Sequence, residues 1–282
     1  MSSSENREIA VPKYFIATPN KPEEGGSVFD IIMIVLVIAG SMSILIGFTN
    51  FQHNGWMLCL GIPGTLFAGS LLIAQSQGDD TRRSNYAEEY KRAEPKPSDQ
   101  QMDEWRNNDL ERIRKESLSK LDLLPNQVMG NPDDPIMVIG PSTGSLAAMG
   151  NDNIIRFSRH DVVIVYLTDY HLAAYSCTID LSSGLQTRES TQEYHYTDVV
   201  SVATQTDNSR IFKVVVNGED KPLANYQKFA LSVASGERIE VAISFPQIDN
   251  IIKNARLAPT GAENAVKIIR ARLREKKGGT QE

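Results

Sequence analysis

The chain has 282 residues, with 29 basic and 35 acidic side chains, a formal net charge of −6 and a sequence pI of about 5.4. This acidic balance excludes a protein that grips nucleic-acid phosphates with its whole surface, so we expect no nucleic-acid partner. The chain has only 4 histidines and 2 cysteines, which excludes a dense metal cluster and a disulfide framework. The length favours two structural units.

Residues 1–27 are predicted to form a flexible tail with one short apolar patch. The polar segments MSSSEN and PNKPEEGG lie near the two ends of the tail, and the patch IAVPKYFIA lies between them. Segments rich in Ser, Glu, Pro and Gly bury too little apolar surface to fold alone. The sequence leaves two positions open for the patch: on lipid headgroups, or against the domain that follows.

Residues 28–78 are set apart by their charge, because Asp30 is their only charged side chain. They contain two uncharged runs, from Ile31 to Phe48 and from Gly55 to Ala74. A run of about 20 apolar residues crosses the hydrocarbon core of a bilayer. The sequence therefore predicts two transmembrane helices in an antiparallel hairpin, since only Thr49–Asn54 separates the runs. The alternative is two buried helices of a globular core.

Basic residues flank this predicted hairpin on one side of the membrane. The tail carries Arg7, Lys13 and Lys21, the other flank carries Arg82 and Arg83, and the connecting segment has no Lys or Arg. Positive residues favour the cytoplasmic side of a membrane. The pattern predicts a two-span protein of the bacterial cytoplasmic (inner) membrane, with both termini in the cytoplasm.

Small residues recur at four-residue spacing in both predicted spans. They are Ala39, Ser43 and Gly47 in the first run and Gly61, Thr65 and Gly69 in the second. Such stripes let helix backbones approach closely in lipid. We expect them to pack the hairpin together; the alternatives are self-association and docking to another membrane subunit. Mid-membrane ionisable groups mark ion pathways, and their absence from the sequence argues against transport by this chain alone.

Residues 79–134 are predicted to be a charged helical linker. Ser98 and Gln101 form a capping-box pattern before a helix from about Asp99 to Leu121. Apolar residues of this helix fall in pairs that repeat every eight residues, so the stripe drifts around the helix and disfavours a long coiled coil. We expect a solvated helix that leans one face on the next domain; the alternative is an oligomerising helix.

Residues 135–282 show the alternation of β-strands. The predicted strands cover residues 136–139, 162–167, 171–180, 191–196, 199–204, 211–216, 226–233 and 238–245. Helical segments are expected at Pro246–Ala255 and Ala262–Lys277. Short strands with a terminal helix predict a small antiparallel barrel that the helix plugs. The predicted fold class is thus an α+β membrane protein with this domain on the cytoplasmic side.

Two segments of this domain carry a family resemblance: YLTDYHLAAY at Tyr166–Tyr175 and EYHYTDVVSV at Glu193–Val202. They resemble bacterial pleckstrin-homology-like (PH-like, GRAM-like) domains. In those, a threonine–aspartate–x–arginine turn enters a strand, and a tyrosine–x–aspartate–isoleucine segment begins a later one. His171 and Val199 depart from this pattern. The resemblance covers about residues 130–277; it implies a split-barrel scaffold for binding or assembly and transfers no ligand residues.

No catalytic motif is visible in the sequence. His160, His171 and His195 lie in or beside predicted strands and are interpreted as surface or sheet-edge residues rather than ligands. Cys59 and Cys177 are predicted to lie far apart, which argues against a disulfide. We therefore predict a protein that is not an enzyme and needs no cofactor or metal.

The last predicted helix has a basic stripe beside an apolar one. The basic stripe is Lys267, Arg270, Arg274 and Lys277, and the apolar stripe is Val266, Ile269 and Leu273. The apolar stripe is expected to plug the β domain, with the cations solvated and favourable near the helix C-terminus. The alternative adds contact of the basic stripe with anionic lipid headgroups.

These features favour a membrane-anchored adaptor, scaffold or complex subunit. Its expected partners are membrane lipids and a protein, either a different one or a second copy of the chain. The alternatives are a module that senses anionic lipids and an accessory subunit of a membrane enzyme or transporter.

Overall fold

The computed structural model describes residues 3–22, 28–49, 56–216 and 219–278. The chain divides into two compact units: residues up to Ala17 together with residues from Pro95 on, and residues from Thr18 to Glu94. It is an α+β protein with antiparallel and mixed sheets.

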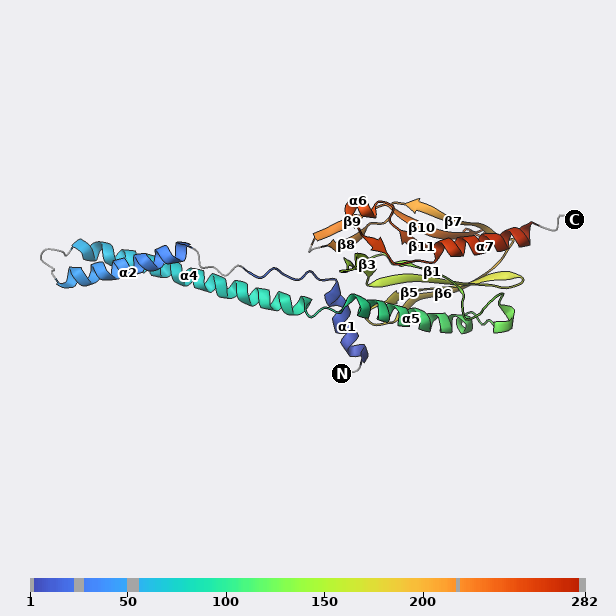
Figure 1. Cartoon of the computed structure of the whole chain (residues 1–282), viewed down its shortest axis with the longest axis horizontal. Coiled ribbons are helices and arrows are strands. Elements are labelled where there is room, and N and C mark those ends of the chain that lie inside the picture. Colours follow the sequence, from blue (N-terminus) through green and yellow to red (C-terminus); the bar gives the residue numbers. More distant parts are fainter. Residues whose placement is uncertain (1–2, 23–27, 50–55, 217–218, 279–282) are drawn as a thin grey trace. The chain divides into compact units, whose positions relative to one another are not determined.

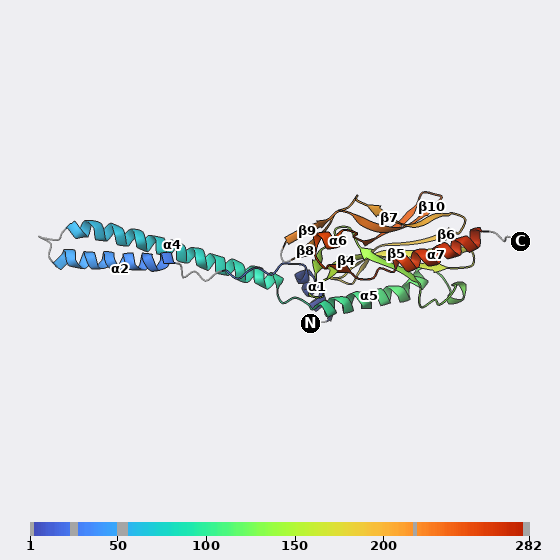
Figure 2. The same cartoon turned by 45° about the horizontal axis from the view of Figure 1, so that its top comes forward.

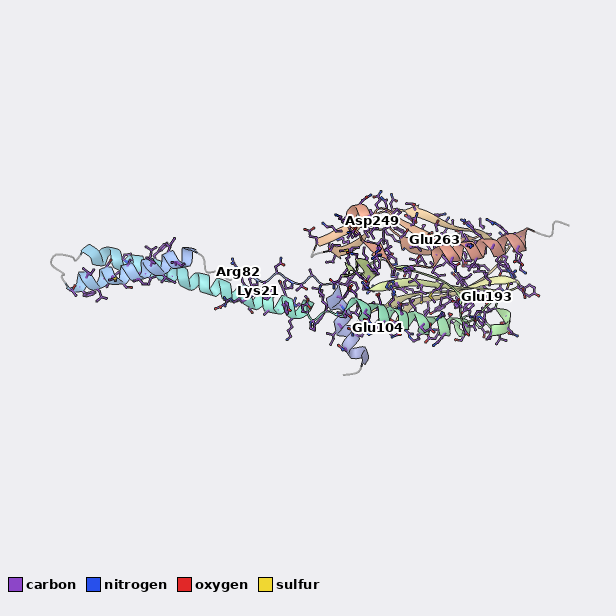
Figure 3. The ribbon with its side chains drawn as sticks, viewed as in Figure 1. Lys21, Arg82, Glu104, Glu193, Asp249 and Glu263 are labelled. Atoms are coloured by element: carbon purple, nitrogen blue, oxygen red, sulfur yellow. The ribbon has the colours of Figure 1, made fainter. Side chains whose placement is uncertain are left out.

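The smaller unit is built from two helices that pack side by side, α2 (Val28–Thr49) and α4 (Trp56–Ala93) (Figures 1 and 2). Met33 is buried and Val37 and Ile44 are half-buried, a spacing that places them on one face of α2. α4 continues through Pro63 into a charged second half that carries Arg82 (Figure 3). Residues 84–91, in the first part of the predicted charged linker, are therefore part of α4.

The structure contradicts the predicted membrane spans. A helix that crosses a bilayer needs about 20 consecutive apolar residues. Over the described parts of the chain, no helix combines the required length with the required apolar character. This finding overturns the two predicted transmembrane helices and, with them, the inner-membrane localisation and the two-span topology. The segment 50–55, which holds most of the predicted connection, lies outside the described residues.

Three sheets and three helices make up most of the larger unit. The strands of the first sheet run in the order β1 (Ile136–Pro141), β4 (Arg159–Leu167), β5 (His171–Asp180) and β6 (Gln186–His195). Those of the second run β11 (Arg238–Ser244), β10 (Tyr226–Val233) and β7 (Val199–Asp207). Those of the third run β12 (Arg256–Leu257), β3 (Ile154–Phe157), β2 (Ala147–Met149), β8 (Phe212–Val216) and β9 (Glu219–Leu223). The helices are α1 (Ser3–Tyr14), α5 (Asp99–Lys120) and α7 (Ala262–Lys277); α6 (Ile248–Ile251) is one turn.

The first sheet is covered on both faces, by α5 on one side and by the second sheet with α7 on the other (Figures 1 and 2). Successive side chains of a strand point to opposite faces. Ile164 of β4 therefore packs toward Ile113 of α5, while Val163 and Val165 pack in the core that contains Ile269 of α7. This two-sided burial explains the nearly continuous apolar run of β4.

Gly140 marks a close approach of the first two sheets. A Cβ atom added to Gly140 would lie 1.6 Å from the carbonyl oxygen of Ala242 in β11. No side chain fits there, so the glycine lets the backbones of β1 and β11 pass each other. The two sheets meet around this point and share one apolar core with α7.

The two segments that carried the family resemblance meet in the structure. The hydroxyl group of Tyr196 donates a hydrogen bond to the carbonyl oxygen of Thr168, at 2.7 Å. The guanidinium of Arg272 in α7 lies over the ring of Tyr196 and 3.4 Å from a carboxylate oxygen of Asp169. These contacts fasten the turn before β5 to the start of the second sheet and to the terminal helix.

Most of the predicted elements are confirmed. β5, β10 and α7 begin and end at the predicted residues, and the side chain of Ser98 caps α5 by accepting a hydrogen bond from the Gln101 N–H at 3.1 Å. β2, β3 and β9 were missed because each is only three to five residues long, too short for a clear alternation. The predicted helix at residues 246–255 is only α6. Glu104 on α5 and Glu263 in the first turn of α7 mark exposed positions of their helices (Figure 3).

The N-terminal patch packs against the larger unit, of which it is a part. Ser3–Tyr14 forms α1, where a flexible segment was expected. Val11, Tyr14 and Phe15 are buried with Met102 of α5 in one apolar cluster. Of the two positions that the sequence left open, the structure shows the one against the domain.

Candidate functional site

A buried arginine holds α1, α5 and the third sheet together. The side chain of Arg156 in β3 is only 4% exposed. Its guanidinium donates to Asp103 at 3.1 and 2.6 Å and to Asp152 at 2.9 and 2.7 Å. The Asp99 carboxylate lies 3.6 Å from it and accepts a 2.7 Å hydrogen bond from the Tyr14 hydroxyl. Three carboxylates around one guanidinium satisfy its donors.

The electrostatics of this Arg156 network follow from its geometry. The hydrogen bond from Arg156 holds the pKa of Asp152 at about 2. Burial acts to lower the pKa of Arg156, but the hydrogen bonds with Asp152 and Asp103 raise it overall. Burial also raises the pKa of Tyr14, and its bond to Asp99 adds to this effect. Asp152 and Arg156 therefore both stay charged at neutral pH, as expected of a contact that stabilises the fold.

Gly150 makes room for this network. A Cβ atom at this position would lie 2.3 Å from a guanidinium nitrogen of Arg156 and 2.7 Å from a carboxylate oxygen of Asp99. The turn between β2 and β3 thus leaves space for the ends of these charged side chains, which an added Cβ atom would displace. A second anchor holds α1 further along: Arg7 pairs with Asp109 and donates to the carbonyl oxygen of Leu181 at 2.6 Å.

Beside the network lies a cavity of about 150 Å³, which we call the α5 cavity. It is bounded by α5, β1 and the segment 257–260. Apolar side chains, among them Leu110, Ile155 and Phe157, form most of its wall. Arg106 and Asn107 from α5 and His160 from β4 add three nitrogen-bearing side chains. This combination of an apolar wall and few polar groups is typical of small-molecule sites.

His160 is buried, contrary to the expectation of a surface or sheet-edge residue. Only 7% of it is exposed, and its ring lies edge-on to Phe157 with centroids 6.2 Å apart. Burial lowers its pKa to about 4, and the positive charge of Arg106 adds to this shift. The imidazole is therefore neutral at pH 7.

Arg106 is a cation with few partners. The nearest carboxylate is that of Asp103, 3.8 Å away, which Arg156 already binds through two hydrogen bonds. Within the part of the chain that the structure describes, its hydrogen bonds go only to Asn107, at 3.3 and 3.4 Å. Burial lowers its pKa because it disfavours the charged form.

A second cavity, of about 250 Å³, adjoins the first, and we call it the outer cavity. The two share Arg106 and the segment 257–259 as lining. Arg256 also lines the outer cavity. Arg106 and Arg256 thus place two cationic side chains around this cavity, beside the carboxylate of Asp103.

The other predicted polar residues have ordinary surroundings. His171 is half-buried, with its Nε2 3.6 Å from a carboxylate oxygen of Glu193, and His195 is exposed. Cys177 is a buried free thiol whose pKa burial raises to about 11. The side chain of Cys59 is outside the described residues.

All four cations of the basic stripe of α7 are exposed, and two of them also donate hydrogen bonds to the second sheet. Arg270 donates to the carbonyl oxygen of Val202 at 2.8 Å, and Lys277 donates to that of Val199, so both cations contact β7. Lys267 and Arg274 are exposed. The apolar stripe packs into the core: Val266 and Ile269 are buried there, and Leu273 packs against them.

The small-residue stripes lie on α2 and α4. Ala39 is exposed, whereas Ser43, Thr65 and Gly69 are half-buried. The hydroxyl groups of Ser43 and Thr65 bond to carbonyl oxygens of their own helices, at 2.9 and 3.0 Å. A Cβ atom at Gly69 would meet no atom within 4 Å. Side-chain positions at 47 and 61 are outside the described residues.

Sequence reasoning missed Arg156, Arg106 and the site role of His160. One signal was present: Arg156 is a lone charge within the run Ile-Ile-Arg-Phe, and a charge in an apolar strand needs a buried partner. Asp99 and Asp103, one helical turn apart, were available as such partners. Nothing in the sequence marked Arg106, because its surroundings depend on how α5 packs.

No group of three or more His, Cys, Asp or Glu side chains among the described residues is placed to hold a metal ion. Comparisons with family models, with curated proteins and with solved structures find no match to this chain.

Proposed function

We propose that this chain is a non-enzymatic adaptor that assembles with further copies of itself through α2 and α4, and that its larger unit is a PH-like binding scaffold. The observation that carries the assembly part is the exposure of large apolar side chains on the smaller unit. Leu45, Leu66 and Phe48 are 67%, 69% and 71% exposed. Contiguous apolar surface of this kind marks an interaction site.

The distribution of these side chains indicates what kind of partner would cover them. Ile31, Ile32, Ile34, Val35 and Leu36 are all exposed, and neighbouring residues of a helix point in different directions. A helix that is apolar on nearly every side is stable only when other apolar surfaces surround it. One partner helix does not provide this cover, whereas a bundle of several helices does.

The proposed partner is the same hairpin in another copy of the chain. Residues 28–78 carry only one charge in the sequence, so a partner surface must be equally apolar to avoid burying unpaired charges. The hairpin itself meets this condition. Soluble oligomers are mostly symmetric assemblies of one chain, in which the same patch serves both sides of the contact.

The order of elements supports the PH-like part of the proposal. Four strands, β1, β4, β5 and β6, form one sheet, three further strands form the next, and α7 follows them. The pairs β2–β3 and β8–β9 lie between these strands along the chain and build most of the third sheet. The contact between Tyr196 and Thr168 gives the two family-like segments a shared structural role.

Sedimentation velocity of the purified full chain tests the assembly. We expect the wild-type chain to associate, and the triple variant Leu36→Gln, Leu45→Gln, Leu66→Gln to associate at least about a hundredfold more weakly, because each buried Leu contributes about 1.5–3 kcal/mol. The matched control, Leu146→Gln, Leu185→Gln, Ile211→Gln, changes three exposed apolar residues of the larger unit and should associate like the wild type.

Two results would overturn the assembly. One is a wild-type chain that sediments as a monomer. The other is a chain that floats with lipid vesicles as a monomer, which would assign the exposed apolar surface to lipid. Equal association of the triple variant and its control would show that the interface does not lie on the hairpin.

A further inference from the structure

The α5 cavity has the size and the chemistry of a ligand site that the adaptor role does not use. A cavity of about 150 Å³ lined by apolar side chains accommodates one aromatic ring. Here the wall includes the rings of Phe157 and His160 and the aliphatic side chain of Leu110. A purely apolar ligand would fill this space, but it would leave Arg106 with only its 3.8 Å ion pair to Asp103, a carboxylate that Arg156 already binds.

The charges around the cavity indicate which chemical group a ligand would need. Arg106 is buried enough for its pKa to be lowered, and the carboxylate of Asp103 is bound by Arg156. A guanidinium removed from water is stabilised most by a carboxylate that accepts two parallel hydrogen bonds. The described protein residues supply no carboxylate in such a two-bond arrangement to Arg106, and its hydrogen bonds to Asn107 are no shorter than 3.3 Å.

We propose that the α5 cavity binds a small aromatic monocarboxylate, with the ring in the apolar pocket and the carboxylate paired with Arg106. The neutral His160 extends the pocket wall as an aromatic surface. Arg256 lines the adjoining outer cavity and increases the positive character at the carboxylate end. This inference concerns only the larger unit, so it stands independently of the proposed assembly.

Isothermal titration calorimetry of the full chain with benzoate tests the proposal. Benzyl alcohol has a similar ring without the charge, and acetate has the charge without the ring. We expect benzoate to bind, and each of the other two probes to bind at least about tenfold more weakly, because each lacks one of the two interactions. Equal binding of benzoate and benzyl alcohol would refute the pairing with Arg106, and equal binding of benzoate and acetate would refute the ring pocket.

Variants locate the site. Arg106→Gln should weaken benzoate binding at least about tenfold, since it removes a charge-assisted contact. Lys115→Gln removes one positive charge from an exposed position of the same helix and should leave binding unchanged. Ala258→Leu keeps all charges but fills the cavity and should abolish binding.

Other outcomes would contradict the proposal. Absence of benzoate binding to the wild-type chain would overturn the proposal, as would binding that survives both Arg106→Gln and Ala258→Leu. Loss of binding in Arg256→Gln with full retention in Arg106→Gln would place the carboxylate in the outer cavity and contradict the assignment. Far-ultraviolet circular dichroism of each variant establishes that it is folded before titration.

Discussion

Replacing Arg156 with methionine would remove the central charge of the Arg156 network while keeping most of the side-chain volume. Three carboxylates would then lose their main counter-charge, with Asp99, Asp103 and Asp152 at 20%, 31% and 39% side-chain exposure. Breaking a fully buried ion pair costs about 3–5 kcal/mol. Because water reaches these carboxylates in part, we expect Arg156→Met to lower the free energy of unfolding by about 2–4 kcal/mol.

A neighbouring arginine provides the matched control. Arg159 pairs with Asp180 at 3.0 Å, but its side chain is 50% exposed. Exposed ion pairs contribute about 0–1 kcal/mol, so Arg159→Met should have little effect. The two substitutions are chemically identical and lie three residues apart, so their difference isolates the effect of burial.

Urea unfolding followed by tryptophan fluorescence measures this difference. The sequence has two tryptophans, and Trp56→Phe leaves Trp105 as the single reporter. Trp105 packs in the cluster that holds α1, and Arg7 lies over its ring at 5.7 Å, so its emission also reports whether α1 is docked. If Arg156→Met and Arg159→Met unfold with equal free energies, the network does not stabilise the fold and the reasoning is refuted.

Two further predictions concern pH and packing. The His160 pKa is about 4 in the folded chain and near 6.5 in the unfolded chain, so the unfolded chain binds the proton first as pH falls. The free energy of unfolding should therefore be highest above pH 6.5 and should fall by about 3 kcal/mol as pH drops to 4. The His160→Gln variant should lack this part of the pH dependence, and the same pH dependence in the variant and the wild type would contradict the prediction. Gly140→Ala should destabilise the chain by at least about 2 kcal/mol, since the added methyl group collides with the carbonyl oxygen of Ala242. In Gly69→Ala the methyl group meets no atom within 4 Å, so this control should be neutral or slightly stabilising in thermal unfolding. Similar losses of stability in both variants would argue against the close approach at Gly140.

The sequence by itself determined most of the local structure of the larger unit. The alternation of residues 226–233 and the amphipathic pattern of residues 262–277 predicted β10 and α7 with their bounds, because periodic burial is a property of consecutive residues. The pattern at Ser98 predicted the start of α5 for the same reason: a helix cap is made by residues three apart.

Features that depend on distant residues were decided only by the tertiary structure. The charge-poor segment 28–78 predicted membrane spans, yet over the described residues no helix is long and apolar enough for one. α1 looked like part of a tail because its stability comes from contacts with α5 and Leu181, far away in the chain. The burial of His160 and the weak pairing of Arg106 arise where α5 packs against β1 and β4, since burial and pairing depend on neighbours in space that a one-dimensional pattern does not contain.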